Sequence, residues 1–99
     1  MLHIVNKSHT QTCALRSCLR LAQPGQALLL TEDAIYAATA AGSAASGIAE
    51  ALARLQVHVL QPDVQARGMA GKLIDGVGAV DYAGFVDLVA AHSTNQSWL

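Results

Sequence analysis

Four short apolar runs, separated by segments of helical character, constrain the fold of this chain more than any other feature. The runs are Leu2–Val5, Ala27–Leu30, Val57–Leu60 and Val77–Val80. Each is typical of a strand, and the second is apolar at every position, as in strands covered on both faces. Strands that alternate with helices pair in parallel through right-handed crossovers. The pattern predicts one α/β domain over residues 1–99, with a parallel or mostly parallel sheet flanked by helices.

Helix signals fill the first two gaps between the strands. The capping-box pattern Ser8–Gln11 predicts a helix that runs to about Ala22 and is stopped by Pro24–Gly25. The acidic pair Glu32–Asp33 predicts a helical turn through Ala37. This pair either complements the dipole at a helix N-terminus or belongs to a ligand site at the carboxyl end of the sheet.

The second half of the chain follows the same pattern. The small-residue stretch Ala38–Gly47 predicts a mobile loop that runs into a helix ending near Leu55. Pro62–Gly68 predicts a short helix, with proline at its start and glycine at its end. Asp81 can cap a last helix before a polar tail. The apolar stripe predicted for that helix consists of Tyr82, Phe85, Val86 and Val89.

Composition suggests that part of the surface is covered by partners. Apolar residues make up 53% of the chain and charged residues only 13%, whereas about a quarter of the residues in typical domains are charged. The net charge is −1, and the six lysines and arginines are scattered along the sequence. Direct nucleic-acid binding normally requires a basic patch, so we do not expect it here.

The sequence also predicts where the chain works. It shows no basic segment followed by a long apolar run at its N-terminus, and no stretch near the ~18 apolar residues of a membrane span. We therefore expect a cytoplasmic protein without membrane contact. In that compartment both cysteines should be reduced and unbridged.

Familiar ligand motifs are incomplete. The segment Gly42–Gly47 has two glycines at P-loop separation, but Ile48 occupies the position of the required lysine. No histidine pairs with another ligand at metal-binding spacing, so no metal and no cofactor are predicted. His3 and His58 each interrupt an apolar strand. They are either hydrogen-bonded within the sheet or at an interface, or one of them is a proton partner for a thiol.

The two cysteines fall on opposite sides of the first predicted helix. At about 100° per residue, Cys18 lies near the centre of an apolar arc with Leu15 and Leu21, whereas Cys13 falls near Arg16. Nearby cations favour a thiolate, so Cys13 is the more reactive thiol from the residues alone. Cys18 is either a small core hydrophobe or, if its helix face covers an interface or lines a cleft, a shielded thiol that a docked donor can reach.

Five segments, taken in order, resemble a known family. They are MLHIVNKS, SCLRLAQPGQALLLTEDAIYAA, PDVQARG, VDYAGFVDLV and the closing QSWL. In type, order and spacing they resemble the DsrH/TusB family of sulfur-relay proteins, over nearly the whole chain. The resemblance implies a DsrE-like fold, a parallel sheet between helices. It also implies a heterohexamer that contains two copies each of this chain, a DsrE/TusD-like subunit and a DsrF/TusC-like subunit.

The resemblance further implies a place in persulfide transfer. The family passes sulfur between proteins, for 2-thiolation of the tRNA wobble uridine in one branch and for cytoplasmic sulfur oxidation in the other. The main persulfide cysteine lies on the DsrE/TusD-like subunit, and a TusE/DsrC-like protein is an expected acceptor. Cys18 matches a cysteine that is found in DsrH-type members and missing from some TusB-type ones, so the resemblance makes it the candidate sulfur-carrying residue and favours the sulfur-oxidation branch.

Three hypotheses follow from the sequence. In the first, Cys18 accepts a persulfide or lies beside the subunit that does. In the second, the chain is a purely structural subunit that completes the heterohexamer. In the third, it is an unrelated small binding module, which the missing phosphate motifs argue against. Without its partners, the chain is expected to be able to self-associate through exposed apolar patches.

Overall fold

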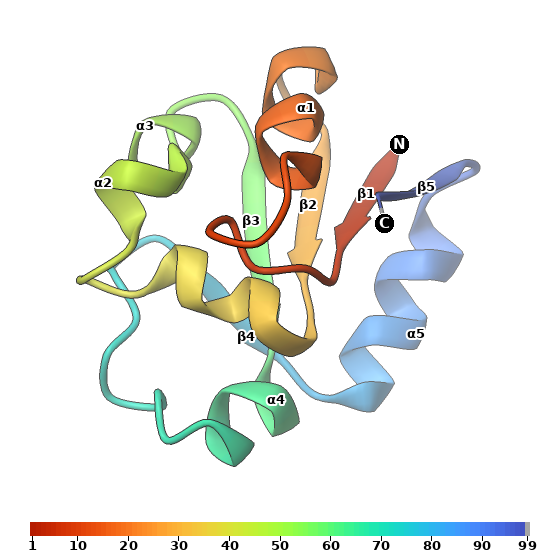
Figure 1. The fold of residues 1–99 in the computed structure, drawn as a ribbon. Coiled ribbons are helices and arrows are strands. Elements are labelled where there is room, and N and C mark those ends of the chain that lie inside the picture. The colour runs from red at the N-terminus through yellow and green to blue at the C-terminus, as the bar shows by residue number, and fades with distance from the viewer. Residues whose placement is uncertain (99) are drawn as a thin grey trace.

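A computed structural model describes residues 1–98 and contains one five-stranded sheet (Figure 1). All neighbouring strands pair in parallel, in the spatial order β4-β3-β2-β1-β5. The strands are β1 (Leu2–Val5), β2 (Ala27–Leu30), β3 (Gln56–Leu60), β4 (Gly78–Val80) and β5 (Asn95–Trp98). The parallel α/β architecture expected from the sequence is therefore confirmed.

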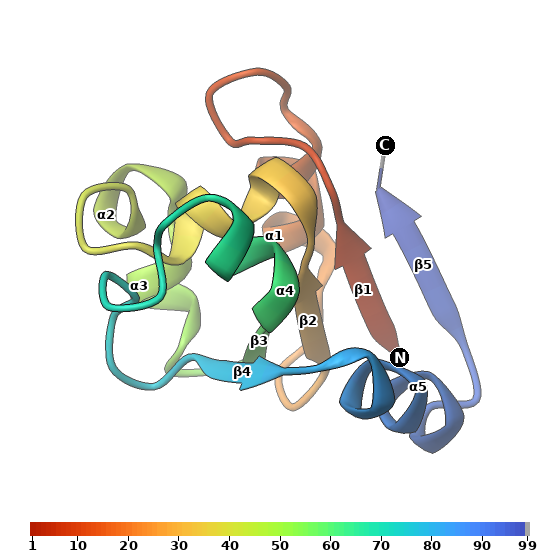
Figure 2. The same cartoon turned by 90° about the horizontal axis from the view of Figure 1, so that it is seen from below.

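The helices cover the two faces of the sheet unequally. One face carries α1 (Ala14–Leu21), the 3₁₀ helix η1 (Glu32–Ala38), α2 (Ser43–Ser46), α3 (Ile48–Ala51) and α4 (Gln61–Ala66). The opposite face carries only α5 (Tyr82–Ala91), which Figure 2 shows alone on its side of the strands. One face of the sheet is thus fully covered, while the other depends on a single helix.

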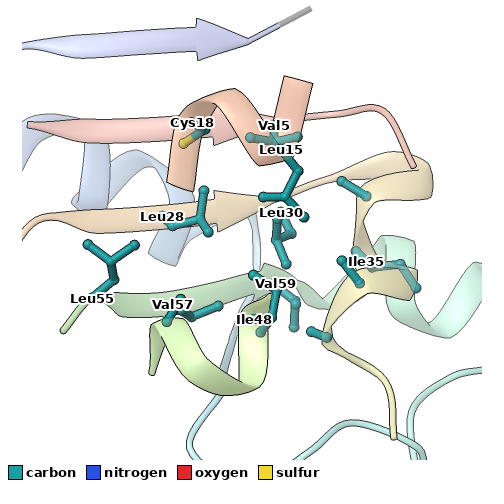
Figure 3. Packing of buried hydrophobic residues seen from close by; sticks show 14 of the residues in the cluster. Val5, Leu15, Cys18, Leu28, Leu30, Ile35, Ile48, Leu55, Val57 and Val59 are labelled. Atoms are coloured by element: carbon teal, nitrogen blue, oxygen red, sulfur yellow. The ribbon is translucent and has the colours of Figure 1, made fainter. Parts of the chain in front are cut away.

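The strand alternation divides the interior into two cores. Leu28 and Leu30 face α1, η1 and α3, where sixteen buried residues form the larger cluster, shown in part in Figure 3. Ala27 and Leu29 face α5 in a cluster with only three buried residues. Since a fully buried leucine or isoleucine contributes about 1.5–3 kcal/mol, most of the folding free energy from apolar burial comes from the larger core.

The predicted start of the first helix is wrong. α1 begins at Ala14, and the Ser8 hydroxyl accepts a hydrogen bond from the backbone N–H of Thr10, 3.2 Å away, instead of capping a helix. The backbone N–H of Gln11 donates to the Ser8 carbonyl at 3.0 Å. The reason is local: serine and threonine side chains can bond the nearby backbone in a turn as well as at a helix N-terminus.

The small-residue stretch before the third strand is ordered rather than a mobile loop. It contains α2, in which Ser43 is buried, and Ser46 donates from its hydroxyl to the Ala37 carbonyl at 2.8 Å. Gly42 is required for this packing, because a Cβ there would lie 2.5 Å from the Tyr36 carbonyl oxygen. Small side chains here permit close approach of the backbone. The following helix is also shorter than predicted, since α3 ends at Ala51.

The polar tail forms a strand that the sequence pattern did not predict. β5 pairs with β1, with Ser97 opposite Ile4 and Trp98 opposite Val5. Because β5 is an edge strand with mostly exposed side chains, it lacks the apolar run that marks the other strands. Backbone pairing and the packing of Trp98 hold it in place.

The last helix is capped as predicted but faces the sheet differently. The Asp81 carboxylate accepts from the backbone N–H of Gly84 at 2.7 Å, as an N-cap residue does. Phe85 and Val89 pack on the sheet together with Leu88. In contrast, the other two members of the predicted stripe are largely exposed; they are Tyr82 and Val86.

Candidate functional site

The candidate thiol Cys18 lies in the larger core. Its relative exposure is 0%, and its side chain is on the sheet-facing side of α1, with Leu15 in the same cluster (Figure 3). Leu28 from β2 and Leu55 from the turn before β3 belong to the same cluster. Leu15 and Cys18 of the predicted apolar arc therefore face the sheet of their own chain, whereas Leu21, predicted on the same arc, is 63% exposed.

Burial determines the chemistry of this thiol. Desolvation raises the pKa of Cys18 from 9.0 to about 12, while the nearby Arg54 guanidinium opposes the increase. The thiolate is the nucleophile in sulfur transfer, as in thiol–disulfide exchange. In this conformation Cys18 is protonated at neutral pH and shielded from solvent, so it behaves as a packing residue.

Arg54 is a charged neighbour of Cys18 that no sequence motif indicated. Its guanidinium donates to the backbone carbonyls of Leu19 and Ala22, the latter at 3.0 Å, and so binds the C-terminal end of α1. Positive charge at this end of a helix is favourable for the helix dipole. Since the contact spans more than 30 positions along the chain, no local motif could have revealed it.

Cys13 is the accessible thiol. It occupies the N-cap position of α1 and is exposed, and both cysteines are unbridged. The expected separation of the two thiols onto a polar and an apolar face is confirmed. The structure does not bring them together into one site, because Cys18 points into the core.

The histidines are not arranged to activate either thiol. His3 is 4% exposed; its Nδ1 accepts from Trp98 Nε1 at 3.2 Å, and its Nε2 donates to Gln26 Oε1 at 2.7 Å. This confirms the hydrogen-bonded interpretation of His3. His58 has a buried Nε2 without a partner, and burial, together with nearby His92, lowers its pKa. Among residues 1–98, no three histidine, cysteine or acidic side chains are grouped as metal ligands.

The acidic pair after β2 forms a structural junction. Asp33 accepts a hydrogen bond from Arg67 Nε at 2.9 Å, and the backbone N–H of Glu32 donates to Asp63 Oδ2 at 2.7 Å. Glu32 has a φ of 50°, which is strained for a residue with a side chain. These contacts join η1 to α4 beside a groove of about 390 Å³. The pair therefore holds two helices together at the carboxyl ends of the strands.

The described chain contains no helix of the length and apolarity needed to cross a membrane. Its fold and thiols define a small parallel α/β protein in which one cysteine is buried and one exposed. The crystal structure of the ychN protein from Escherichia coli has the same fold, with a TM-score of 0.74. The alignment covers 98% of this chain and 97% of that one, at 18% identity.

Sequence relatives give the family. A family model described as "DsrH like protein" matches residues 7–95. Protein TusB of Klebsiella pneumoniae is 38% identical over 100 residues, and that of Serratia proteamaculans is 36% identical over 100 residues. Each alignment covers 99% of this chain and 100% of the relative. The chain belongs to the DsrH/TusB family, as its sequence resemblance predicted, and the DsrE-like fold is confirmed with it.

Proposed function

We propose that this chain is a structural subunit of a cytoplasmic sulfur-relay complex that serves 2-thiolation of the tRNA wobble uridine. Membership in the DsrH/TusB family supports the relay, and relatives that bear the name TusB favour tRNA thiolation over sulfur oxidation. The observation that carries the structural role is the complete burial of Cys18. A buried, protonated thiol neither attacks a persulfide nor receives a docking donor.

Its partners in this proposal are a DsrE/TusD-like subunit, which carries the persulfide, and a DsrF/TusC-like subunit. An exposed apolar surface on α5 supports such an assembly. Helix α5 has one charged residue, Asp87, and exposes Tyr82 and Val86 at 62% and 64%. A helix that is apolar around most of its circumference is typical of a buried position. We propose that another subunit of a heterohexamer covers it, before sulfur passes to a TusE/DsrC-like acceptor.

A second candidate function keeps Cys18 as a persulfide carrier. Arg54 lies close enough to the thiol to lower its pKa against the effect of burial. In this alternative the C-terminal end of α1 opens in the assembled complex. The freed Cys18 thiolate attacks the outer sulfur of a donor persulfide, the donor S–S bond breaks, and the donor thiolate leaves with that electron pair.

Alkylation of the two cysteines distinguishes these functions. The native chain and the assembled complex are treated with a neutral thiol reagent, and each site is read by mass spectrometry. We expect Cys13 to react readily and Cys18 to react only after unfolding, because only Cys13 is exposed. Rapid native labelling of Cys18, in the chain or in the complex, would favour the carrier.

The 2-thiouridine content of tRNA, which reports sulfur flux, tests the same two functions with a matched pair of cysteine variants. We expect Cys18→Ala to leave both the complex and the 2-thiouridine content of tRNA unchanged, with Cys13→Ala as the control at the exposed thiol. A marked loss of thiouridine in Cys18→Ala with an intact complex contradicts the structural role. Mass spectrometry after incubation with a persulfide donor then shows whether Cys18 gains sulfur.

A further inference from the structure

Arginines are concentrated along one groove of this otherwise slightly acidic chain. The groove has a volume of about 350 Å³ and lies between α1 and the α2–α3 segment, which are neighbours in Figure 1. Three of the four arginines in the sequence line it: Arg16, Arg20 and Arg54. They face one lining carboxylate, that of Glu50. We call this surface the arginine groove.

Two of these guanidinium groups are available to a ligand. Arg16 and Arg20 lie on exposed positions of α1, and no carboxylate of residues 1–98 forms a salt bridge with either of them. By contrast, Arg67, outside the groove, pairs with Asp33 at 2.9 Å. Arg54 also lines the groove, and its guanidinium is held by the carbonyl groups of Leu19 and Ala22. The groove therefore combines one fixed cation with two unpaired ones.

The wall opposite the arginines consists of small side chains, which allow a ligand to approach the backbone closely. It consists of small residues from Ala44 to Gly47, followed by Ala51. Gly47 has a φ of 87°, and a Cβ there would lie 3.2 Å from Leu19 Cδ1, so α1 and the α2–α3 connection are nearly in contact at this point. The short side chains of Ala44, Ala45 and Ala51 make this wall partly apolar. A polypeptide strand with alternating acidic and apolar side chains fits such a surface.

We propose that the arginine groove binds a carboxylate-bearing segment of a partner protein. Guanidinium groups match carboxylates with two parallel hydrogen bonds, which gives orientation as well as affinity. A nucleic acid fits less well, because the other cations, Lys7, Arg67 and Lys72, do not line the groove. The inference deepens the proposed function and rests on it for the setting in a relay complex.

A peptide titration of the isotopically labelled full-length chain tests the proposal. The probe is the capped peptide ELDEL, its neutral control is QLNQL, and binding is followed through backbone amide NMR shifts. We expect ELDEL, but not QLNQL, to shift the amides of 44–47 and of Arg16 and Arg20. The variant R16Q/R20Q should weaken ELDEL binding by about tenfold or more, because it removes both unpaired cations.

The control variant K7Q/K72Q removes the same charge at exposed positions outside the arginine groove. It should change the affinity for ELDEL by less than about twofold, since it affects only the long-range electrostatic field of the protein. Equal weakening in the two variants, or no groove shifts with ELDEL, overturns the proposal. Tighter binding of oligouridylate at the same amides also overturns it, in favour of a nucleic acid. None of these results depends on Cys18 or α5, on which the proposed function rests. Failure of the arginine groove to bind the peptide is therefore distinguishable from failure of the proposed function.

Discussion

At the scale of single residues, burial decides which of two chemically identical thiols can react. Cys13 and Cys18 are five positions apart, yet one is exposed and the other has no accessible surface. Helical periodicity placed the two on opposite faces of one helix, with Cys18 on the apolar face. It could not tell whether the apolar face of that helix meets its own sheet or a partner. In the folded chain, Leu15 and Cys18 of α1 pack on β1 and β2, so this part of the helix meets its own sheet.

The raised pKa of Cys18 predicts a specific pH dependence of stability. The folded pKa of about 12 exceeds the ordinary value of 9.0, so the unfolded chain loses this proton first as the pH rises. The contribution of the protonated thiol is complete below pH 9 and is lost towards pH 12. The free energy of unfolding should fall there by up to about 1.4 kcal/mol per pH unit from this group.

Urea unfolding of the wild type, Cys18→Ala and Cys13→Ala across pH 9–12 measures the effect. Cys18→Ala should be less stable by about 1–2 kcal/mol at neutral pH, because it leaves a small cavity, and its decline with pH should be shallower. Cys13→Ala should follow the wild type. Parallel curves for all three proteins would show that Cys18 does not titrate as a buried group.

At the scale of elements, long-range contacts create structure where local patterns give little signal. β5 has only polar residues before Trp98, and nothing in that pattern predicts a strand. Its place is set by pairing with β1 and by the bond from Trp98 Nε1 to His3 Nδ1, groups 95 positions apart. The ordering of α2 has a similar origin, because Ser46 bonds the carbonyl of Ala37 in the preceding helix.

Replacement of Trp98 should release β5 from the sheet. Trp98→Ala removes both the packing against the larger core and the hydrogen bond to His3, and should cost about 1–3 kcal/mol, less than for a fully buried tryptophan. Amide hydrogen exchange should accelerate in β5, with a smaller effect in β1. Trp98→Phe keeps most of the packing and should cost about 1 kcal/mol. Unchanged exchange in Trp98→Ala would mean that backbone pairing alone holds the strand.

At the scale of the whole molecule, the unequal coverage of the sheet explains the unusual composition. Five helices cover one face and share a large core, whereas α5 alone covers the other. The surplus of apolar residues is therefore not fully used by the chain itself, and part of it is exposed on α5. Interfaces of permanent complexes resemble a domain core divided between two chains, and for this reason we propose α5 as an interface.

A charge placed on α5 should prevent assembly without unfolding the chain. Val86→Glu adds a carboxylate at a position that is 64% exposed, so the fold should tolerate it, whereas an apolar interface should not. We expect loss of the complex with the DsrE/TusD-like and DsrF/TusC-like subunits in size-exclusion chromatography. Gln65→Glu adds the same charge at an exposed position of α4 and should assemble normally. A normal complex with Val86→Glu would place the interface elsewhere.

Local patterns in the sequence were enough to predict the class of fold and to place Cys18 on the apolar face of its helix. Apolar runs and helix signals have local causes, since alternation and periodicity follow from backbone geometry. For this reason the run Ala27–Leu30 predicted the buried central strand, β2. Asp81 likewise predicted the N-cap of α5. The family resemblance likewise rested on short segments that are visible in the chain.

The surroundings of those positions depend on contacts that form only in the folded chain. The burial of Cys18, its proximity to Arg54 and the junction of Glu32 with Asp63 all depend on contacts between distant segments. The arginine groove has the same origin, because folding brings Arg54 next to α1. Such contacts follow from the packing of whole elements, in which no short window of sequence holds both partners.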